Sequence, residues 1–193
     1  MRAGLALACA IVVSTALAGC GFLNPGSMVS PALMTIGSSE LGQNMLPATY
    51  TCHGKGISPP ITWSGAPSGT TKGYALVVDD SSAPLTPFVY WIVTGIGPGT
   101  TDIQEGALPP GATQAMNSAG TAKYDPPCPQ GAPHSYRITI YALDTELTLP
   151  AGTALKTAWT DIAAATIARG RYPVTANPLS VITFRNYPRR ELW

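Results

Sequence analysis

The sequence predicts a mainly β domain with one helix near its C-terminal end, and three observations carry that prediction. Glycine and proline supply 20 and 19 of the 193 residues, too many for long continuous helices. Hydrophobic residues make up 45% of the chain, which is enough for a sizeable core. Several short runs have the length and composition of strands, whereas only one segment has a helical period.

Five short runs rich in β-branched and aromatic residues are predicted to be strands. The run 74–78 is continuously apolar, which is typical of a central strand that is buried on both faces. The run 136–143 alternates large residues with small or polar ones, as a half-buried strand does. The full set is 61–63, 74–78, 88–93, 136–143 and 181–184.

The predicted helix follows the strand 136–143 and is expected to bury one face on a sheet. Its spacing rests on Leu155, Trp159, Ile162 and Thr166. We expect Thr153 to cap its N-terminus, with Arg169 in the last turn and Gly170 as the C-cap. Core aromatic positions are predicted for Trp63, Trp91 and Trp159.

The N-terminal segment has the pattern of an export signal. Arg2 precedes a small-apolar run from Ala3 to Ala18, which is short for a bilayer span. The ending Leu17-Ala18-Gly19-Cys20 resembles a bacterial lipobox, in which the cysteine is lipidated and becomes the first residue of the mature chain. The alternative is an ordinary secretory signal with an incidental cysteine.

These features predict three parts of the chain. Residues 1–19 are a lipoprotein signal peptide, residues 20–31 hold the lipidated cysteine and a flexible tether, and residues 32–193 form the domain. Acyl chains such as palmitate on Cys20 are expected to anchor the protein in the bacterial envelope, on the outer face of the plasma membrane. Without Arg2 the chain has ten basic and ten acidic side chains, so nucleic acid is not an expected partner.

Two cysteines remain once Cys9 leaves with the signal and Cys20 is lipidated. Cys52 and Cys128 are an even pair in an oxidising compartment, so we predict a disulfide between them. A zinc site that adds His53 and His134 is the competing interpretation, but the sequence has no Cys-x-x-Cys spacing. No metal and no cofactor is therefore predicted.

Polar side chains that could form a site are concentrated in two loops. Asp79 and Asp80 come directly after the run 74–78, where an Asx-type turn is the simpler interpretation. His134 follows a proline-rich loop and precedes the strand at Tyr136, and a solvated surface histidine is the simpler interpretation there. A Cys52–Cys128 bond would draw the loop around His53 toward the His134 loop and favour a shared site.

Several motifs are spaced over residues 32–184, at 51–63, at Asp80 with Ala83-Pro84, at 108–112, and from Pro127 through His134 to Tyr136. In this order they resemble the phosphatidylethanolamine-binding protein family, and most closely its bacterial Raf-kinase-inhibitor-like branch. The resemblance implies that residues 32–193 form two packed antiparallel sheets with a C-terminal helix. It also implies a small anion pocket for phosphate or a phospholipid headgroup.

The resemblance assigns the pocket residue by residue. Asp80 and His134 are the ligand-binding residues whose chemistry is retained, whereas Tyr90 replaces a pocket histidine and Ser81-Ser82 replace a Pro-Asp pair. The implied pocket wall consists of Ser58, Pro59, Ala83, Pro84, Pro127, Pro129 and Tyr136. Because a charge-assisted hydrogen bond is exchanged for a neutral one at Tyr90, anion binding is expected to be weakened.

The sequence therefore predicts a lipid-anchored, non-catalytic binding protein whose partners are an anionic small molecule and, through the anchor, a membrane. One alternative is a protein-interaction module whose surface loops inhibit a protease or another partner enzyme, as some members of the resembled family do. Another is a hydrolase that uses Ser58 or Ser82 with His134 and Asp80, although no Gly-x-Ser-x-Gly motif marks a nucleophile.

Overall fold

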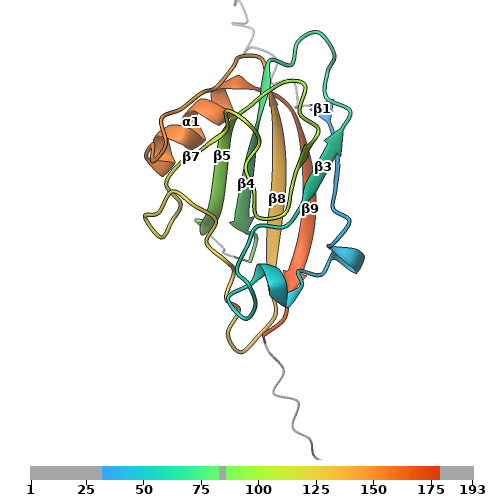
Figure 1. The fold of residues 1–193 in the computed structure, drawn as a ribbon, viewed down its shortest axis with the longest axis vertical. Coiled ribbons are helices and arrows are strands. Elements are labelled where there is room, and N and C mark those ends of the chain that lie inside the picture. Colours follow the sequence, from blue (N-terminus) through green and yellow to red (C-terminus); the bar gives the residue numbers. More distant parts are fainter. Residues whose placement is uncertain (1–31, 83–85, 179–193) are drawn as a thin grey trace, which may run out of the picture. The chain divides into compact units, whose positions relative to one another are not determined.

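Two β-sheets face each other in the computed structural model, which describes residues 32–82 and 86–178 (Figure 1). One sheet has six strands in the order β1-β9-β8-β4-β5-β7, and the other has three in the order β2-β3-β6. All neighbouring strands are antiparallel except β1 and β9. The strands are β1 Ala32–Leu33, β2 Thr35–Gly37, β3 Ile61–Ser64, β4 Gly73–Asp80, β5 Val89–Ile96, β6 Asp102–Ile103, β7 Thr113–Gln114, β8 His134–Leu143 and β9 Thr166–Ala176, with α1 Leu155–Ala165 and short 3-10 turns at Gly42–Asn44 and Ala48–Tyr50.

The central strand is β4, as its apolar sequence predicts. All eight of its residues are buried, and it pairs with β8 on one side and β5 on the other. Its two faces belong to two different cores. Leu76 and Val78 pack between the two sheets, whereas Ala75 and Val77 pack on the opposite face, beneath α1.

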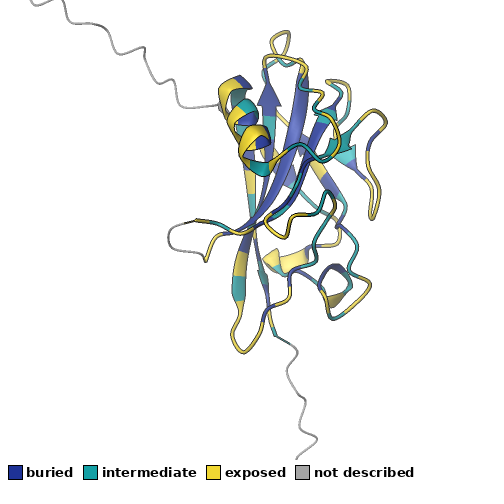
Figure 2. Cartoon of the chain, turned by 90° about the vertical axis from the view of Figure 1, so that its left-hand side faces the viewer, coloured by how far each residue is buried: buried dark blue, intermediate teal, exposed yellow. Residues whose placement is uncertain are grey.

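Strand β8 shows the predicted alternation. Tyr136, Ile138 and Ile140 face the core between the sheets, whereas Arg137 and Tyr141 face the opposite side. This opposite side, called the outer face below, carries α1. Figure 2 shows the contrast, with buried strands beneath a helix whose far surface is exposed. Among the described residues, no helix is long and apolar enough to cross a membrane.

The predicted end of the helix is wrong. Helix α1 buries Ala158, Ile162 and Ala165 but ends at Ala165, and Thr166–Ala176 is the long strand β9. Arg169 and Gly170 therefore lie in β9 and do not terminate the helix. Ten residue pairs join β9 to β8, and the backbone hydrogen bonds of that ladder favour the strand over further helical turns.

Gly170 has a different role from the predicted C-cap. A Cβ at this position would lie 2.8 Å from the carbonyl oxygen of Met34, so only glycine lets the neighbouring backbone come this close. The predicted cap Thr153 is also wrong, because Ala154 precedes the first helical residue. The Thr153 hydroxyl instead donates to the Pro150 carbonyl over 2.7 Å.

The tryptophans divide into two groups. Trp63 and Trp91 lie in the core between the sheets, as predicted. Trp159 does not: its side chain sits on α1 with 39% of the residue exposed, so the prediction of a core position is wrong. The helical spacing places Trp159 near the sheet but on the margin of the buried stripe formed by Ala158 and Ile162.

Strand β9 has a partly covered outer edge. β1 pairs with it only at Ala168 and Arg169, and Met45 forms an isolated bridge with Thr175. The exposed Pro173 lies between these two contacts. The predicted strand 181–184 and the predicted signal and tether lie outside the described residues.

Candidate functional site

Asp80 and His134 meet at one end of the six-stranded sheet. Asp80 is the last residue of β4 and His134 the first of β8, and the two strands are hydrogen-bonded neighbours. The His134 Nδ1 atom lies 3.2 Å from Asp80 Oδ2. The carboxylate is nearly buried, with 10% of its side chain exposed, whereas the imidazole is 40% exposed. A buried acceptor thus orients a ring that solvent can reach.

The two adjacent aspartates point in opposite directions because β4 alternates its side chains. Asp80 faces His134, whereas Asp79 accepts hydrogen bonds from the Arg137 guanidinium on the outer face, one of them from Nε over 3.1 Å. This contact with Asp79 raises the pKa of Arg137, and burial acts in the opposite direction. Asp79 is therefore neutralised by its own partner, and Asp80 is the carboxylate of the site.

Serine side chains join the end of β4 to the start of β8. The Ser82 amide donates to Asp80 Oδ1 over 2.7 Å, which is the Asx-type turn that the sequence suggested as an alternative. The Ser81 hydroxyl donates to the Ser135 carbonyl over 2.8 Å, and the Ser135 amide donates to Ser82 Oγ over 3.0 Å. Ser81 and Ser82 thus hold the end of β4 that carries Asp80 against the start of β8 that carries His134.

Aromatic rings form the inner wall beside this pair. The His134 and Tyr136 rings are stacked with centroids 6.3 Å apart, and Tyr90 meets Tyr136 edge-on at 5.4 Å. Phe88, 37% exposed, covers Tyr90 with ring centroids 4.8 Å apart. Burial raises the pKa of Tyr90, and so do the charges of Asp80 and Asp125, while the contact with Tyr136 lowers it.

The second tyrosine is affected in the same way. Burial raises the pKa of Tyr136, with further contributions from Tyr90 and Asp80. Both phenols therefore remain protonated at neutral pH. A protonated phenol can donate a hydrogen bond to an anion.

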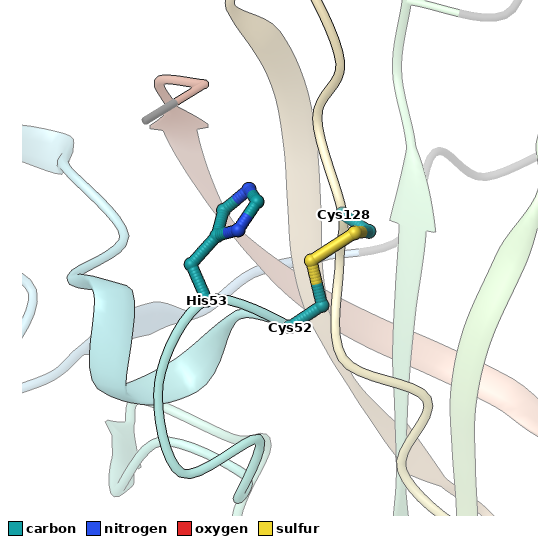
Figure 3. A group of neighbouring side chains, drawn as sticks. All are labelled: Cys52, His53 and Cys128. Carbon is teal, nitrogen blue, oxygen red and sulfur yellow. A yellow bond between two sulfur atoms is a disulfide. The ribbon is translucent and has the colours of Figure 1, made fainter. Parts of the chain in front are cut away.

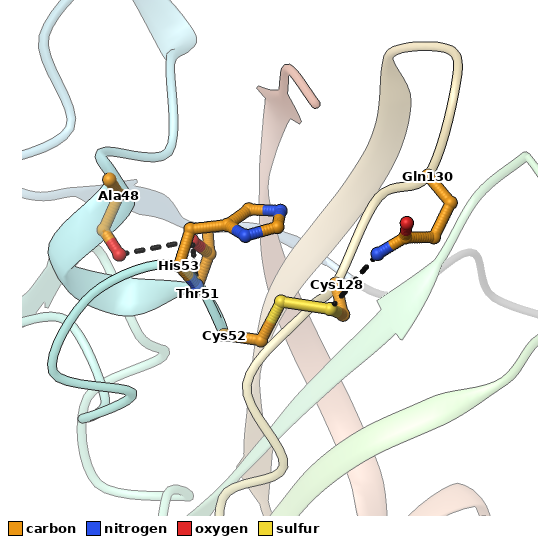
Figure 4. The surroundings of a disulfide bond; sticks show 6 residues. All are labelled: Ala48, Thr51, Cys52, His53, Cys128 and Gln130. Atoms are coloured by element: carbon orange, nitrogen blue, oxygen red, sulfur yellow. Dashed lines mark hydrogen bonds between the residues drawn. A yellow bond between two sulfur atoms is a disulfide. The ribbon is translucent and has the colours of Figure 1, made fainter. Parts of the chain in front are cut away.

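The predicted disulfide joins the two loops. Cys52 and Cys128 are bonded across 76 positions of the sequence, and the Cys52 amide also donates to the Pro127 carbonyl over 3.1 Å. Figure 4 shows the surroundings, with the Gln130 side-chain amide 3.4 Å from the Cys128 sulfur. The proline-rich loop that leads to His134 is therefore fixed to the turn after Ala48–Tyr50.

The His53 ring lies beside this disulfide (Figure 3). Its ligand atom and the two sulfurs lie within 4.8 Å of one another, which is three of the four residues in the zinc interpretation. Two sulfurs bonded to each other do not offer the thiolates that zinc binds, so the oxidised site does not fit that metal. The His53 Nε2 atom is buried and has no hydrogen-bond partner within the described part of the chain.

The predicted wall residues fall into four groups. Tyr136 lines the site, and Pro59, Pro127 and Pro129 are buried in the two neighbouring loops. Ser58 lines a separate cleft of about 310 Å³ with Trp91 and Tyr124. Ala83 and Pro84 lie outside the described residues. Over the described ranges, no hydrogen bond links Ser58 or Ser82 to His134, as a hydrolytic triad would need.

A sequence model of the family described as "Phosphatidylethanolamine-binding protein" matches residues 37–177. The chain belongs to this family. The match covers the strands from β3 to β9, the disulfide and the Asp80–His134 pair. The family and fold class that the sequence predicts, with two packed sheets and a C-terminal helix, are confirmed.

Relatives of this phosphatidylethanolamine-binding (PEBP) domain include proteins from archaea and bacteria. A UPF0098 protein of Methanothermobacter thermautotrophicus is 42% identical over 112 residues, which are 55% of this chain and 74% of the archaeal protein. A Mycobacterium tuberculosis protein named "Putative lipoprotein LppC" is 42% identical over 109 residues, 55% of this chain and 53% of its own length. The chain thus spans about half the length of the mycobacterial relatives it matches.

Solved structures show the same PEBP fold. The Escherichia coli protein YbcL, described as a member of the mammalian PEBP family, superposes with a TM-score of 0.68 at 28% identity, covering 75% of this chain and 98% of YbcL. A PEBP homologue from Chlamydia trachomatis gives 0.67 at 32% identity, covering 74% of this chain and 96% of its own.

Sequence reasoning missed the connections around the pair. Ser135 accepts a hydrogen bond from Ser81 at the end of β4, and the Phe88 ring contacts Tyr90. Neither Ser135 nor Phe88 belongs to a motif that would have marked it in the sequence. The β4–β8 register, with Asp80 opposite Tyr136, would have indicated Ser135. No signal in the sequence fixes that register.

Proposed function

We propose that this PEBP-family protein binds a small anionic group, a phosphate or a phospholipid headgroup, between Asp80, Tyr90 and His134. The contact between Asp80 and His134 carries the proposal. Within residues 32–82 and 86–178, the other imidazole nitrogen forms no hydrogen bond, and the partly exposed ring lies next to two phenols that stay protonated. Such a cluster of donors suits an oxyanion.

The Asp80 contact determines how the imidazole acts. When Nδ1 of His134 donates to the Asp80 carboxylate, Nε2 of the neutral ring is only an acceptor. Nε2 becomes a donor when the ring gains a proton, and it then also carries a positive charge toward the anion. Binding should therefore be stronger in acid than at neutral pH.

The departures from the family pattern reduce the affinity without removing the site. Tyr90 supplies a neutral donor in place of a cation, and the contact with Phe88 and Tyr136 holds its ring in place. Ser81 and Ser82 remove a carboxylate and replace it with hydrogen bonds to Ser135. A weak pocket, with its geometry retained, is the expected result.

Anchoring to a membrane is the second part of the proposal. The Leu17-Ala18-Gly19-Cys20 ending resembles a lipobox, and the name of the LppC relative describes a lipoprotein. An anchored domain would meet phospholipid headgroups at high local concentration. A location in the cell envelope, on the outer face of the plasma membrane, follows from this proposal.

Calorimetry with glycerophosphoethanolamine tests the pocket. This phosphodiester keeps one phosphate charge between pH 5.5 and 7.5, so a change in affinity reports on the protein. We expect tighter binding at pH 5.5, and a loss of at least tenfold in affinity in His134→Ala. His53→Ala, which removes the other histidine, is the matched control and should bind as wild type does.

Two results would contradict the proposal. Affinity that is equal in wild type and His134→Ala would place the ligand elsewhere. A protein partner that stays bound to His134→Ala, recovered with the detergent-solubilised chain, together with no heat from the phosphodiester, would favour the inhibitory interaction module.

A further inference from the structure

A cleft lies between α1 and the outer face of the six-stranded sheet. It measures about 260 Å³. Trp159 and Ile162 come from α1, Tyr141 from β8, and Arg169 and Arg171 from β9. Three elements, α1, β8 and β9, thus contribute side chains to this one cleft.

The two arginines lie on one face of β9 because they are two residues apart. Their backbones are separated by about 7 Å along the strand. Arg169 is opposite Tyr141 in the β8–β9 register, and Arg171 is opposite Thr139. Burial raises the pKa of Tyr141, and so does the charge of Asp79 on the same face, while the positive charges of Arg171 and Arg169 lower it, in agreement with guanidinium groups close to the phenol.

The charge of the cleft is not balanced by the side chains that line it. No carboxylate is among its lining residues, and within the described ranges neither Arg169 nor Arg171 forms an ion pair. Arg137, on the same face of the sheet, has Asp79 as its partner. The sheet therefore carries a neutralised arginine at one row, and positive charges in a hollow two rows away (Arg171) and four rows away (Arg169).

The walls of the cleft that come from α1 are apolar, unlike the side formed by the two arginines. Trp159 is the exposed tryptophan of the described chain, and it lines this hollow together with the buried Ile162, as well as a neighbouring hollow of about 210 Å³ with Val89 and Leu155. A large aromatic residue that is exposed at a cavity is typical of ligand contact. The walls therefore suit a flat or apolar group, and the arginines suit an anion.

We propose that this cleft is a second binding site, for a small organic phosphate that also carries an aromatic or apolar group. The phosphate contacts Arg169 and Arg171, and the apolar group packs on Trp159. The volume of the cleft is large enough for a molecule the size of a lipid headgroup or of a single aromatic ring with a phosphate.

The cleft is independent of the Asp80–His134 pocket. His134 and Tyr141 point to opposite faces of β8 and are about 23 Å apart along it. The inference therefore goes beyond the function proposed above, and each site can be removed without altering the other.

The same chemistry has two sources, a soluble phosphate ester and a lipid headgroup. The position of β1 bears on the lipid source, because β1 pairs with β9 at Arg169. Leu33 pairs in parallel register with Arg169 and is 87% exposed, so the chain enters the fold beside the cleft.

The test uses calorimetry on the full-length chain, purified in a non-ionic detergent, with His134→Ala to remove the first pocket. The probes are phenyl phosphate, inorganic phosphate and dihexanoyl phosphatidylglycerol, a short-chain lipid. We expect phenyl phosphate to bind at least tenfold more tightly than inorganic phosphate. Stronger binding of phenyl phosphate identifies a soluble source, and stronger binding of the lipid identifies a headgroup.

Variants locate the site. Arg169→Gln with Arg171→Gln should lower the affinity at least tenfold, and Trp159→Ala should remove the preference for phenyl phosphate over inorganic phosphate. Lys156→Gln removes one positive charge from α1 outside the cleft and should change nothing. If the double arginine variant does not fold, as judged by its melting curve, Trp159→Ala at an exposed position still tests the cleft.

The outcomes separate the two sites. Binding of phenyl phosphate that is lost with His134→Ala alone would overturn the cleft and leave the first pocket standing. Binding that survives His134→Ala and is lost with the arginine pair supports the cleft, whether or not the first pocket binds. Equal affinity in all variants, or no heat from any probe, would overturn the cleft.

Discussion

Tyr90 is the residue on which the strength of the proposed pocket depends. It stands where the resemblance to the family implies a histidine, beside Asp80 and packed on Tyr136. Tyr90→His should raise the affinity for glycerophosphoethanolamine at pH 5.5 about fivefold, because a second imidazolium adds about 1 kcal/mol. Tyr90→Phe, which keeps the ring and loses the donor, should lower it by a similar factor. Equal affinities by calorimetry in all three proteins would show that residue 90 does not touch the ligand.

The tyrosines also predict how stability depends on pH. Burial raises the pKa of Tyr90, Tyr136 and Tyr124 in the folded protein above the value of about 10 in the unfolded chain. Their neutral forms thus stabilise the fold fully below pH 10, and this contribution is lost as the pH rises through the folded values. Urea unfolding should give a lower free energy at pH 11 than at pH 9. Tyr90→Phe should reduce this difference, and a difference unchanged in the variant would argue against burial as the cause.

Single residues also show what a sequence can reveal about a site. Asp80 and His134 were identifiable because each follows or precedes a strand within a family motif. The Ser81–Ser135 bond and the Asp79–Arg137 pair were not, because both depend on which residues of β4 and β8 are opposite one another. A shift of one residue in that register would exchange the partners of Asp79 and Asp80.

At the scale of elements, Gly170 of β9 lets the backbone at Met34 approach this strand closely. A Cβ there would be 2.8 Å from the Met34 carbonyl oxygen, and backbone atoms cannot move aside easily. Gly170→Ala should lower the free energy of unfolding by about 1–3 kcal/mol. Gly99→Ala is the matched control, since no atom lies within 4 Å of its added Cβ, and it should have little effect. Equal urea midpoints for the two variants would contradict the close approach.

The boundary between α1 and β9 shows why local pattern alone was insufficient. Thr166 fits the helical spacing and Gly170 fits a C-cap, yet both lie in a strand. Pairing with β8 decides the conformation, and the residues that supply it are more than twenty positions earlier in the chain. The runs 74–78 and 136–143 were predictable because their own burial pattern determines them.

At the scale of the whole molecule, the Cys52–Cys128 bond joins distant loops. It closes a loop of 76 residues, so its removal should lower the free energy of unfolding by about 2–4 kcal/mol. The double variant Cys52→Ala, Cys128→Ala tests this by urea unfolding. A reductant should produce the same loss in wild type and none in the variant. No change in either would show that the two loops are held by other contacts.

The exposed Pro173 has a consequence for molecules that share a surface. Proline has no amide hydrogen, so an approaching chain finds no donor at this point of the β9 margin. If many copies were anchored to one membrane, an unpaired edge strand could form backbone hydrogen bonds with the edge strand of another copy and so extend the sheet. We expect Pro173 to weaken such pairing, because the extended sheet would lack one backbone hydrogen bond at this position.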